Sequence, residues 1–153
     1  ALITPSGFYN VKYRRLRHLL DYLAAQPDGW NRLRTAPLEI LREELLAIHG
    51  IGPETADSIL LYAFERPTFV VDAYTRRLFG RLGERWLAEA PYEAVRAHFM
   101  AHLPSNHALY NEYHALIVVH GKARCRKRPL CAGCPLENDC LFEAQRVASA
   151  TQP

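Results

Sequence analysis

Apolar residues recur at intervals of three and four along most of this 153-residue chain, and this spacing constrains its fold more than any other feature. Such recurrence is typical of amphipathic α-helices, whereas half-buried strands alternate every second residue. Only Thr68–Val71 has a β-like composition, and we interpret this short stretch as an extended connector. We therefore expect an all-α fold with helices over 11–25, 38–48, 55–64, 72–81, 92–103, 106–119 and 136–148.

The composition is that of a globular protein, with 49% hydrophobic and 23% charged residues. The longest aliphatic run is Ile117–Val119, which is too short to cross a bilayer, so we expect no membrane partner. A net charge of +3 does not by itself indicate nucleic acid. The basic residues are nevertheless concentrated, because five of the seven residues from 122 to 128 are Lys or Arg.

Residues 45–56 form two helical stretches joined by a turn in which Gly50 and Gly52 lie two positions apart. Glycine permits a positive φ and leaves the backbone uncovered, so N–H groups in this turn can meet an anion. Pro53 suits the first turn of the following helix, whose N-terminus also favours a phosphate. Ile51 and Thr55 belong to the same candidate phosphate site. The alternative is an ordinary helix–turn–helix corner.

All four cysteines, Cys125, Cys131, Cys134 and Cys140, lie within sixteen residues, and the preceding 124 residues contain none. A disulfide scaffold spreads its cysteines along the chain, so this clustering favours ligands of one inorganic centre in a reducing, cytoplasmic protein. The spacing alone allows either zinc or an iron–sulfur cluster.

Gly50–Pro53 is followed by Val70, Val71 and Asp72 and then by the late cysteines, and this combination resembles the helix-hairpin-helix DNA glycosylases of the endonuclease III superfamily. The resemblance runs from Gly7 to Cys140. It implies a helical barrel domain over 1–104, with the hairpin at 38–64, and a lobe over 105–153 that holds a [4Fe–4S] cluster. The first cysteine interval is one residue shorter than in the family, so zinc stays open.

The resemblance also implies a monomer that acts on double-stranded DNA containing a damaged base and is nucleoid-associated in a bacterium or archaeon. Family members carry further helices before the point that corresponds to residue 1. We therefore expect the chain to lack these helices, and its first and middle helices to expose apolar faces.

The resemblance assigns Asp72 as the catalytic carboxylate, which stabilises the oxocarbenium-like sugar as the N-glycosidic bond breaks. A helix N-cap is the alternative role of Asp72, and the two can coexist. Glu54 stands where lyase members of the family carry a nucleophilic lysine. A carboxylate cannot form a Schiff base, so we expect a monofunctional glycosylase.

Residues 50–57, followed by residues 70–74, are similar to the 3-methyladenine glycosylase branch, in which glutamate also replaces the lysine. This resemblance implies an alkylated purine as the base removed. Such a cationic base favours an aromatic pocket. Tyr74 is the first candidate for this pocket, and others are Tyr110, Tyr113, His114, Trp86 and Phe99. Each of them could equally be a core aromatic.

Other residues are candidates for contact with DNA. Phe8 matches the family's wedge, which fills the gap left by the flipped base, although it could instead cover the start of the first helix. Lys12 lies beside it. The basic run consists of Lys122, Arg124, Arg126, Lys127 and Arg128, and it suits phosphate contacts or a solvated turn. A lyase, a non-catalytic DNA-binding module and a zinc adaptor are the alternative functions.

Overall fold

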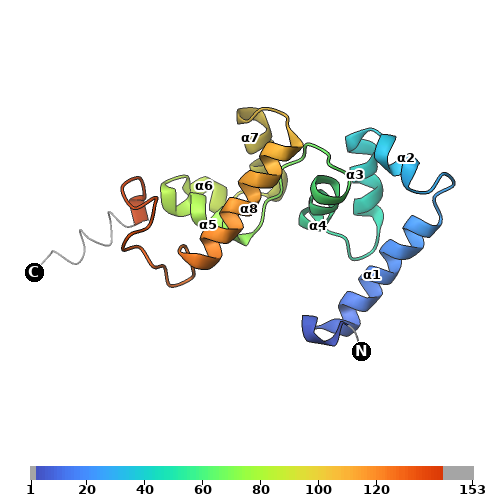
Figure 1. Ribbon diagram of the computed structural model, residues 1–153, viewed down its shortest axis with the longest axis horizontal. Coiled ribbons are helices and arrows are strands. Elements are labelled where there is room, and N and C mark those ends of the chain that lie inside the picture. Colours follow the sequence, from blue (N-terminus) through green and yellow to red (C-terminus); the bar gives the residue numbers. More distant parts are fainter. Residues whose placement is uncertain (1–2, 143–153) are drawn as a thin grey trace, which may run out of the picture. The chain divides into compact units, whose positions relative to one another are not determined.

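The computed structural model describes residues 3–142 and divides the chain into two compact units, residues 1–66 and 67–153. Each unit is built from helices, and the described residues contain no strand (Figure 1). The expected all-α fold is therefore confirmed. No helix in this part of the chain is long and apolar enough to span a bilayer.

The first unit contains a short 3-10 turn and the helices that form the hairpin. Its elements are η1 (Thr4–Ser6), α1 (Tyr9–Ala24), α2 (Trp30–Thr35), α3 (Leu38–Ala47), α4 (Pro53–Ser58) and the π-helical turn η2 (Ile59–Ala63). α2, α3, α4 and η2 bury one apolar core, which consists of Leu33, Leu41, Leu45, Ile48, Ile51, Ala56, Leu60 and Phe64. This core fixes the geometry of the α3–α4 hairpin.

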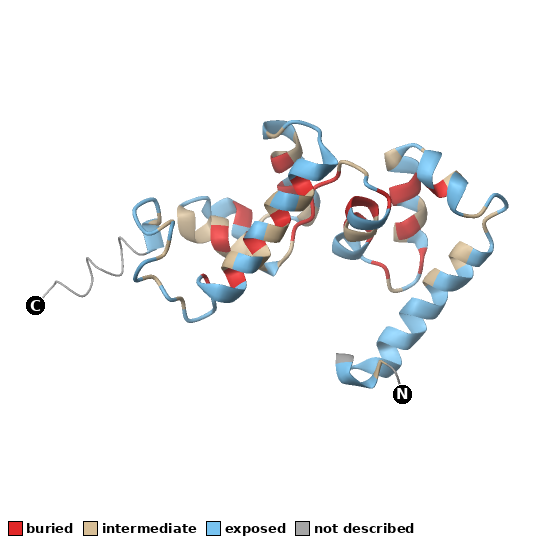
Figure 2. Ribbon diagram, viewed as in Figure 1, coloured by how far each residue is buried: buried red, intermediate tan, exposed pale blue. Residues whose placement is uncertain are grey.

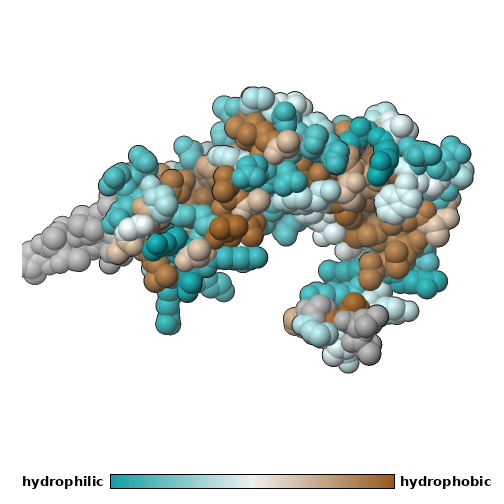
Figure 3. All heavy atoms as spheres, in the orientation of Figure 1, coloured by the Kyte–Doolittle hydropathy of each residue, from teal (hydrophilic) through white to brown (hydrophobic). Residues whose placement is uncertain are grey.

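Helix α1 packs on this core only through its C-terminal half, by means of Leu19, Tyr22 and Leu23. Leu16 and Leu20 are 44% and 51% exposed, and no residue of α1 is buried. Figure 2 shows the helix in the colour of exposed residues along most of its length. An apolar face on the first helix is thus exposed, as expected, and apolar side chains lie at the surface in Figure 3.

The second unit consists of α5 (Ala73–Leu82), α6 (Arg85–Glu89), α7 (Tyr92–His102) and α8 (His107–Ala123), followed by the cysteine segment. α5 packs against both α6 and α8. In the core the ring of Phe69 stacks on Phe99, with 4.2 Å between centroids, and meets the edge of Tyr110. Thr68–Val71 is buried but belongs to no strand, which confirms the extended connector.

Three sequence expectations differ from the structure. The compact units meet at Arg66 and Pro67, whereas the sequence placed the domain boundary at residues 104 and 105, because α8 packs on α5 in one unit.

The last helix does not begin at Leu136. Cys134 and Leu136 instead accept turn hydrogen bonds from Glu137 and Asp139, and helix resumes at Leu141, while residues 143–148 lie outside the described residues. The helices α2 and α6 were not predicted, since five or six residues show too little periodicity.

Candidate functional site

The positive φ that the sequence predicts for the glycines of the α3–α4 turn occurs at Gly50 but not at Gly52. Gly50 has a φ of 94°, and a Cβ atom there would lie 2.3 Å from Cγ of Arg15. Gly52 is extended, with a φ of −98°, and no neighbouring atom would meet a Cβ. Gly50 therefore sets the turn, while Gly52 gives the backbone an open surface.

The two residues beside Gly52 have different roles in the hairpin. Ile51 buries its side chain in the core, and its N–H donates to the Ile48 carbonyl at 3.0 Å. The Ile51 N–H is therefore already paired within the turn. Pro53 begins α4, as predicted, and both Gly52 and Thr55 are exposed.

A buried ion pair ties the two hairpin helices together. Nε of Arg42 donates to Oδ1 of Asp57 at 2.8 Å, and Nη2 donates to Oδ2 at 3.0 Å. The Asp57 side chain is 0% exposed and that of Arg42 is 9% exposed. This two-point contact holds α3 and α4 at a set distance, and it was not predicted from the sequence.

Phe8 and Lys12 lie at the start of α1, and both are exposed. Phe8 has a φ of 46° at the N-cap position and is 88% exposed, so it does not cover the helix as a hydrophobic staple would. Two further basic side chains of α1 approach the hairpin turn: Arg15 lies over Gly50, and Nδ1 of His18 is 3.0 Å from the His49 carbonyl oxygen.

Asp72 caps the N-terminus of α5. Its Oδ1 accepts hydrogen bonds from the Thr75 N–H at 2.7 Å and from the Thr75 hydroxyl at 2.9 Å. The side chain is 11% exposed. The N-cap alternative is confirmed, and the cap leaves Oδ2 to face another group.

That group is His114, whose Nε2 lies 3.6 Å from Oδ2 of Asp72. His114 is on the buried face of α8 with Tyr110, Ile117 and Gly121. Burial acts to raise the pKa of Asp72, but the contacts with His114 and Thr75 outweigh it and leave the pKa below its usual value. Asp72 is therefore held as a carboxylate in a mostly buried position.

Tyr74 is packed by groups of the protein itself. The guanidinium of Arg77 lies 5.0 Å from the ring centroid, and a Cβ at Gly121 would lie 2.4 Å from Cδ1 of the ring. Tyr74 lines an open hollow together with Ala73, Arg77, Gly121, Lys122, Arg126 and Lys127. These basic residues make the hollow better suited to a phosphate than to a cationic base.

Two of the other aromatic candidates belong to the core. Tyr110 is 0% and Phe99 is 5% exposed, and both pack on Phe69. Burial raises the pKa of the half-buried Tyr113, which lies beside the same ring. Trp86 is exposed on α6 and meets the ring of His98. Of the six candidates, only His114 lies against the Asp72 carboxylate.

The four cysteines line one cavity, into which His120 also faces. Cys125 is buried and the other three are half-buried. In residues 3–142 no three His, Cys, Asp or Glu side chains lie close enough to hold a metal ion, so the thiols share a cavity without meeting at a point. Zinc would draw four sulfurs to about 2.3 Å from one centre, whereas a cluster spreads them around a larger body. Four cysteine thiolates are a donor set for either group, so the residues present fit a cluster as well as zinc.

The basic run surrounds the first cysteine, and all five of its side chains are exposed. Nε of Arg126 donates to the Lys122 carbonyl at 2.9 Å, and Nη1 of Arg124 donates to the Ala132 carbonyl at 3.4 Å. Backbone contacts therefore hold two of the charges in place, while Lys127 and Arg128 extend the same positive surface.

Comparison with known proteins shows which family the chain resembles. Residues 40–62 match the model of the helix-hairpin-helix motif. The chain is 46% identical over 142 residues to a Methanocaldococcus jannaschii protein named "Putative DNA repair glycosylase", and 30% identical over 146 residues to endonuclease III of Thermotoga maritima. These alignments cover 92% and 95% of this chain, but 64% and 63% of the relatives.

A solved structure of a non-covalent endonuclease III–DNA complex has a TM-score of 0.75 and 27% sequence identity, over 95% of this chain and 64% of that one. The chain is similar, over nearly its whole length, to proteins of the helix-hairpin-helix DNA glycosylase superfamily. It spans a little under two thirds of the length of these relatives.

The residues whose pattern in the sequence resembles this superfamily lie in both units of the chain. The hairpin, Phe8, Lys12 and Glu54 belong to residues 1–66, whereas Asp72, the basic run and the cysteines belong to residues 67–153. Glu54 is exposed in the first turn of α4. The sequence did not pair His114 with Asp72, although helical spacing with Tyr110, Ile117 and Gly121 could have placed it on the buried face of α8.

Proposed function

We propose that this chain is a DNA repair glycosylase that hydrolyses the N-glycosidic bond of a damaged base flipped out of the duplex. The observation that carries the proposal is the Asp72 carboxylate, which is mostly buried and yet has a lowered pKa. An ionised carboxylate that is shielded from water stabilises developing positive charge strongly. The similarity to a "Putative DNA repair glycosylase" supports the same reaction.

In this mechanism Oδ1 of Asp72 stays bound to Thr75, and Oδ2 faces the anomeric carbon as the base leaves. The carboxylate stabilises the oxocarbenium-like sugar and orients the attacking water. His114 is a positioning residue, because its contact with Oδ2 keeps Asp72 ionised before the substrate binds.

We further propose that the enzyme is monofunctional and acts on an alkylated purine such as 3-methyladenine. Glu54 supports the first part, because its carboxylate cannot form the Schiff base that a lyase needs. A base that already carries a positive charge leaves without being protonated by an acid. An ionised Asp72, which cannot donate a proton, agrees with such a substrate. Tyr74 stays a candidate for the pocket wall, although Arg77 already lies over its ring.

Duplex DNA is the proposed partner, bound through its phosphates by Gly50, Gly52 and Thr55 of the hairpin and by the basic run. Phe8, at 88% exposure, is the proposed wedge, with Lys12 beside it. We propose a monomer that acts in the cytoplasm, associated with the nucleoid in a bacterium or archaeon.

The proposed cofactor is a [4Fe–4S] cluster held by Cys125, Cys131, Cys134 and Cys140, in line with the cavity that these thiols share. When bound, the cluster supplies a rigid anchor for the cysteine segment rather than a reacting group. The backbone contacts of Arg124 and Arg126 then present charge to DNA from a fixed loop.

The test is release of free base from a methylated duplex by the wild type and by Asp72→Asn. Asparagine is as good an N-cap as aspartate, so the variant keeps the cap of α5 and loses only the charge. We expect 3-methyladenine release by the wild type and loss of about a hundredfold or more in the variant. Equal release by both proteins would contradict the role of Asp72. DNA binding without release would favour the non-catalytic module.

An endonuclease III-like glycosylase and lyase is the second candidate function, and the names of several relatives favour it. Borohydride reduces a Schiff base to a stable adduct, so it traps a lyase on DNA and leaves a monofunctional enzyme free. We expect no trapped adduct on abasic DNA. An adduct together with release of oxidised pyrimidines would favour the lyase.

A further inference from the structure

Arg81, near the end of α5, binds the beginning of the cysteine segment through three hydrogen bonds. Its Nη1 donates to Sγ of Cys125 at 3.2 Å and to the Arg126 carbonyl at 2.7 Å. Its Nη2 donates to the Lys127 carbonyl at 3.1 Å. The planar guanidinium thus holds one thiol and the two residues that follow it.

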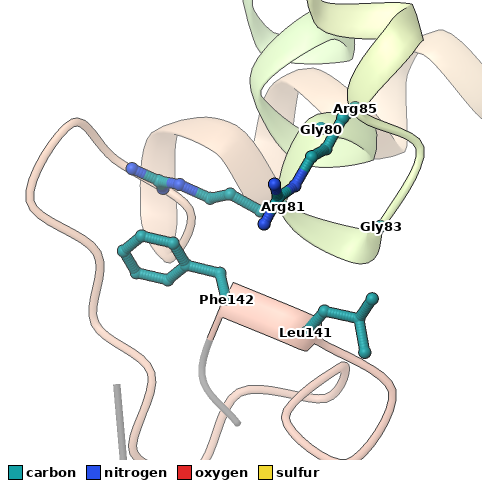
Figure 4. Close-up of a pocket in the computed structure, with 6 residues that line it drawn as sticks. All are labelled: Gly80, Arg81, Gly83, Arg85, Leu141 and Phe142. Atoms are coloured by element: carbon teal, nitrogen blue, oxygen red, sulfur yellow. The ribbon is translucent and has the colours of Figure 1, made fainter. Parts of the chain in front are cut away.

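The end of the cysteine segment meets the same residue. The guanidinium of Arg81 lies 4.7 Å from the centroid of the Phe142 ring, and Sγ of Cys140 lies 3.6 Å from the Arg81 carbonyl oxygen. Figure 4 shows Phe142 beside the Arg81 side chain and Leu141 next to Gly83. A Cβ at Gly83 would lie 2.8 Å from Cδ1 of Leu141, so this glycine allows the chain to dock closely.

One arginine therefore joins the first and the last cysteine of the segment. Arg81 also lines the cavity that the four cysteines share. Arg77 on the same helix donates from Nε to the Cys125 carbonyl at 2.8 Å, but this contact reaches only the start of the segment, whose later residues form turns and are mostly exposed. A cationic N–H donor to a thiolate lowers the electron density on sulfur and favours the reduced, more negative state of a cluster.

We propose that Arg81 is the positioning residue that closes the cysteine segment over its cluster and sets both the rate of iron loss and the cluster's reduction potential. The inference rests on the proposed cofactor and not on the proposed glycosylase reaction. Arg81 acts on the ligands and does not touch the substrate, so its effect is visible without any DNA.

The experiment compares the full chain with its Arg81→Gln, Arg81→Lys and Phe142→Ala variants. Arg85→Gln is the matched control, because Arg85 lines the neighbouring cavity in Figure 4 but donates no side-chain hydrogen bond among the described residues. Iron and sulfide content are measured first. Loss of the cluster's visible absorbance in the presence of an iron chelator and peroxide then gives the rate, and protein-film voltammetry gives the potential.

We expect Arg81→Gln to lose iron about tenfold faster or more, and its potential to fall below that of the wild type. Arg81→Lys keeps the positive charge but loses the planar guanidinium that binds several acceptors at once. The reduction potential of its cluster should therefore stay near that of the wild type, while its rate of iron loss should be intermediate. Phe142→Ala should speed iron loss with little change in potential, and Arg85→Gln should match the wild type.

Two outcomes would overturn the inference, and they are distinguishable. If the wild type contains no iron and sulfide, the proposed cofactor and the role of Arg81 are both wrong. The proposed glycosylase reaction is then still tested separately by the base-release assay. A wild type with a cluster, and an Arg81→Gln variant that matches Arg85→Gln in both rate and potential, would contradict the role of Arg81 alone. Helical circular dichroism checks that each variant is folded.

Discussion

Nε2 of His114 on α8 lies 3.6 Å from Oδ2 of Asp72 at the N-cap of α5. Thr75 occupies the other carboxylate oxygen, so Asp72 is fixed at both ends within one unit of the chain. A carboxylate held in this way is a helix cap and an ionised group at once. The structural role that the sequence suggested and the catalytic role that we propose therefore do not compete.

Replacing His114 should move the acidic side of the pH–rate profile. Contacts with His114 and Thr75 lower the pKa of Asp72 against the effect of burial, so activity should fall as pH drops through this lowered pKa. In His114→Phe the pKa of Asp72 rises, and the loss of base release should begin at a higher pH. Tyr113→Phe, on the same helix, is the control, and an unshifted acidic limb in His114→Phe would refute the coupling.

The two hairpin glycines should respond differently to alanine. Gly50 has a positive φ and contacts the Arg15 side chain, so Gly50→Ala should destabilise the first unit by about 1–2 kcal/mol and weaken DNA binding. Gly52→Ala meets no atom and keeps an ordinary φ, so its unfolding midpoint should match that of the wild type. Equal midpoints for the two variants, measured in urea, would show that the turn does not depend on Gly50.

Removing one partner of the Arg42–Asp57 pair should destabilise the protein more than removing both partners. Arg42→Met leaves the charge of the buried Asp57 without the guanidinium and should lower the free energy of unfolding by about 3–5 kcal/mol. Arg42→Met combined with Asp57→Leu removes both charges and should recover part of the loss. Urea unfolding measures both, with the exposed Arg34→Met as control. A double variant no more stable than Arg42→Met would argue against an ion-pair clamp.

Glu44 should contribute stability that is lost in acid. Hydrogen bonds from Arg32 and Tyr22 lower its pKa from 4.5 to about 2, and the ion pair with Arg32 joins α2 to α3. Because the folded pKa is the lower one, the contribution is complete above pH 4.5 and disappears as pH falls toward 2. Melting temperatures should therefore fall more steeply in acid for the wild type than for Glu44→Gln, with Glu43→Gln as control. Parallel curves would exclude this linkage.

The sequence by itself determined the features that depend on local spacing. Apolar periodicity located α1, α3, α5, α7 and α8 to within a few residues, and the hairpin turn followed from two glycines and a proline. Asp72 as an N-cap and Thr68–Val71 as a connector were also predicted correctly, because the residues that form each feature are neighbours in the chain.

Only the tertiary structure decided which distant side chains meet. His114 lies on an apolar helix, and Arg81 and Arg42 lie on amphipathic ones, so in sequence each resembles an ordinary core or surface residue. Their partners Asp72, Cys125 and Asp57 are supplied by other elements once packing is complete. Periodicity shows which face of a helix is buried, whereas the choice of partner depends on how the helices pack, and that depends on the whole core.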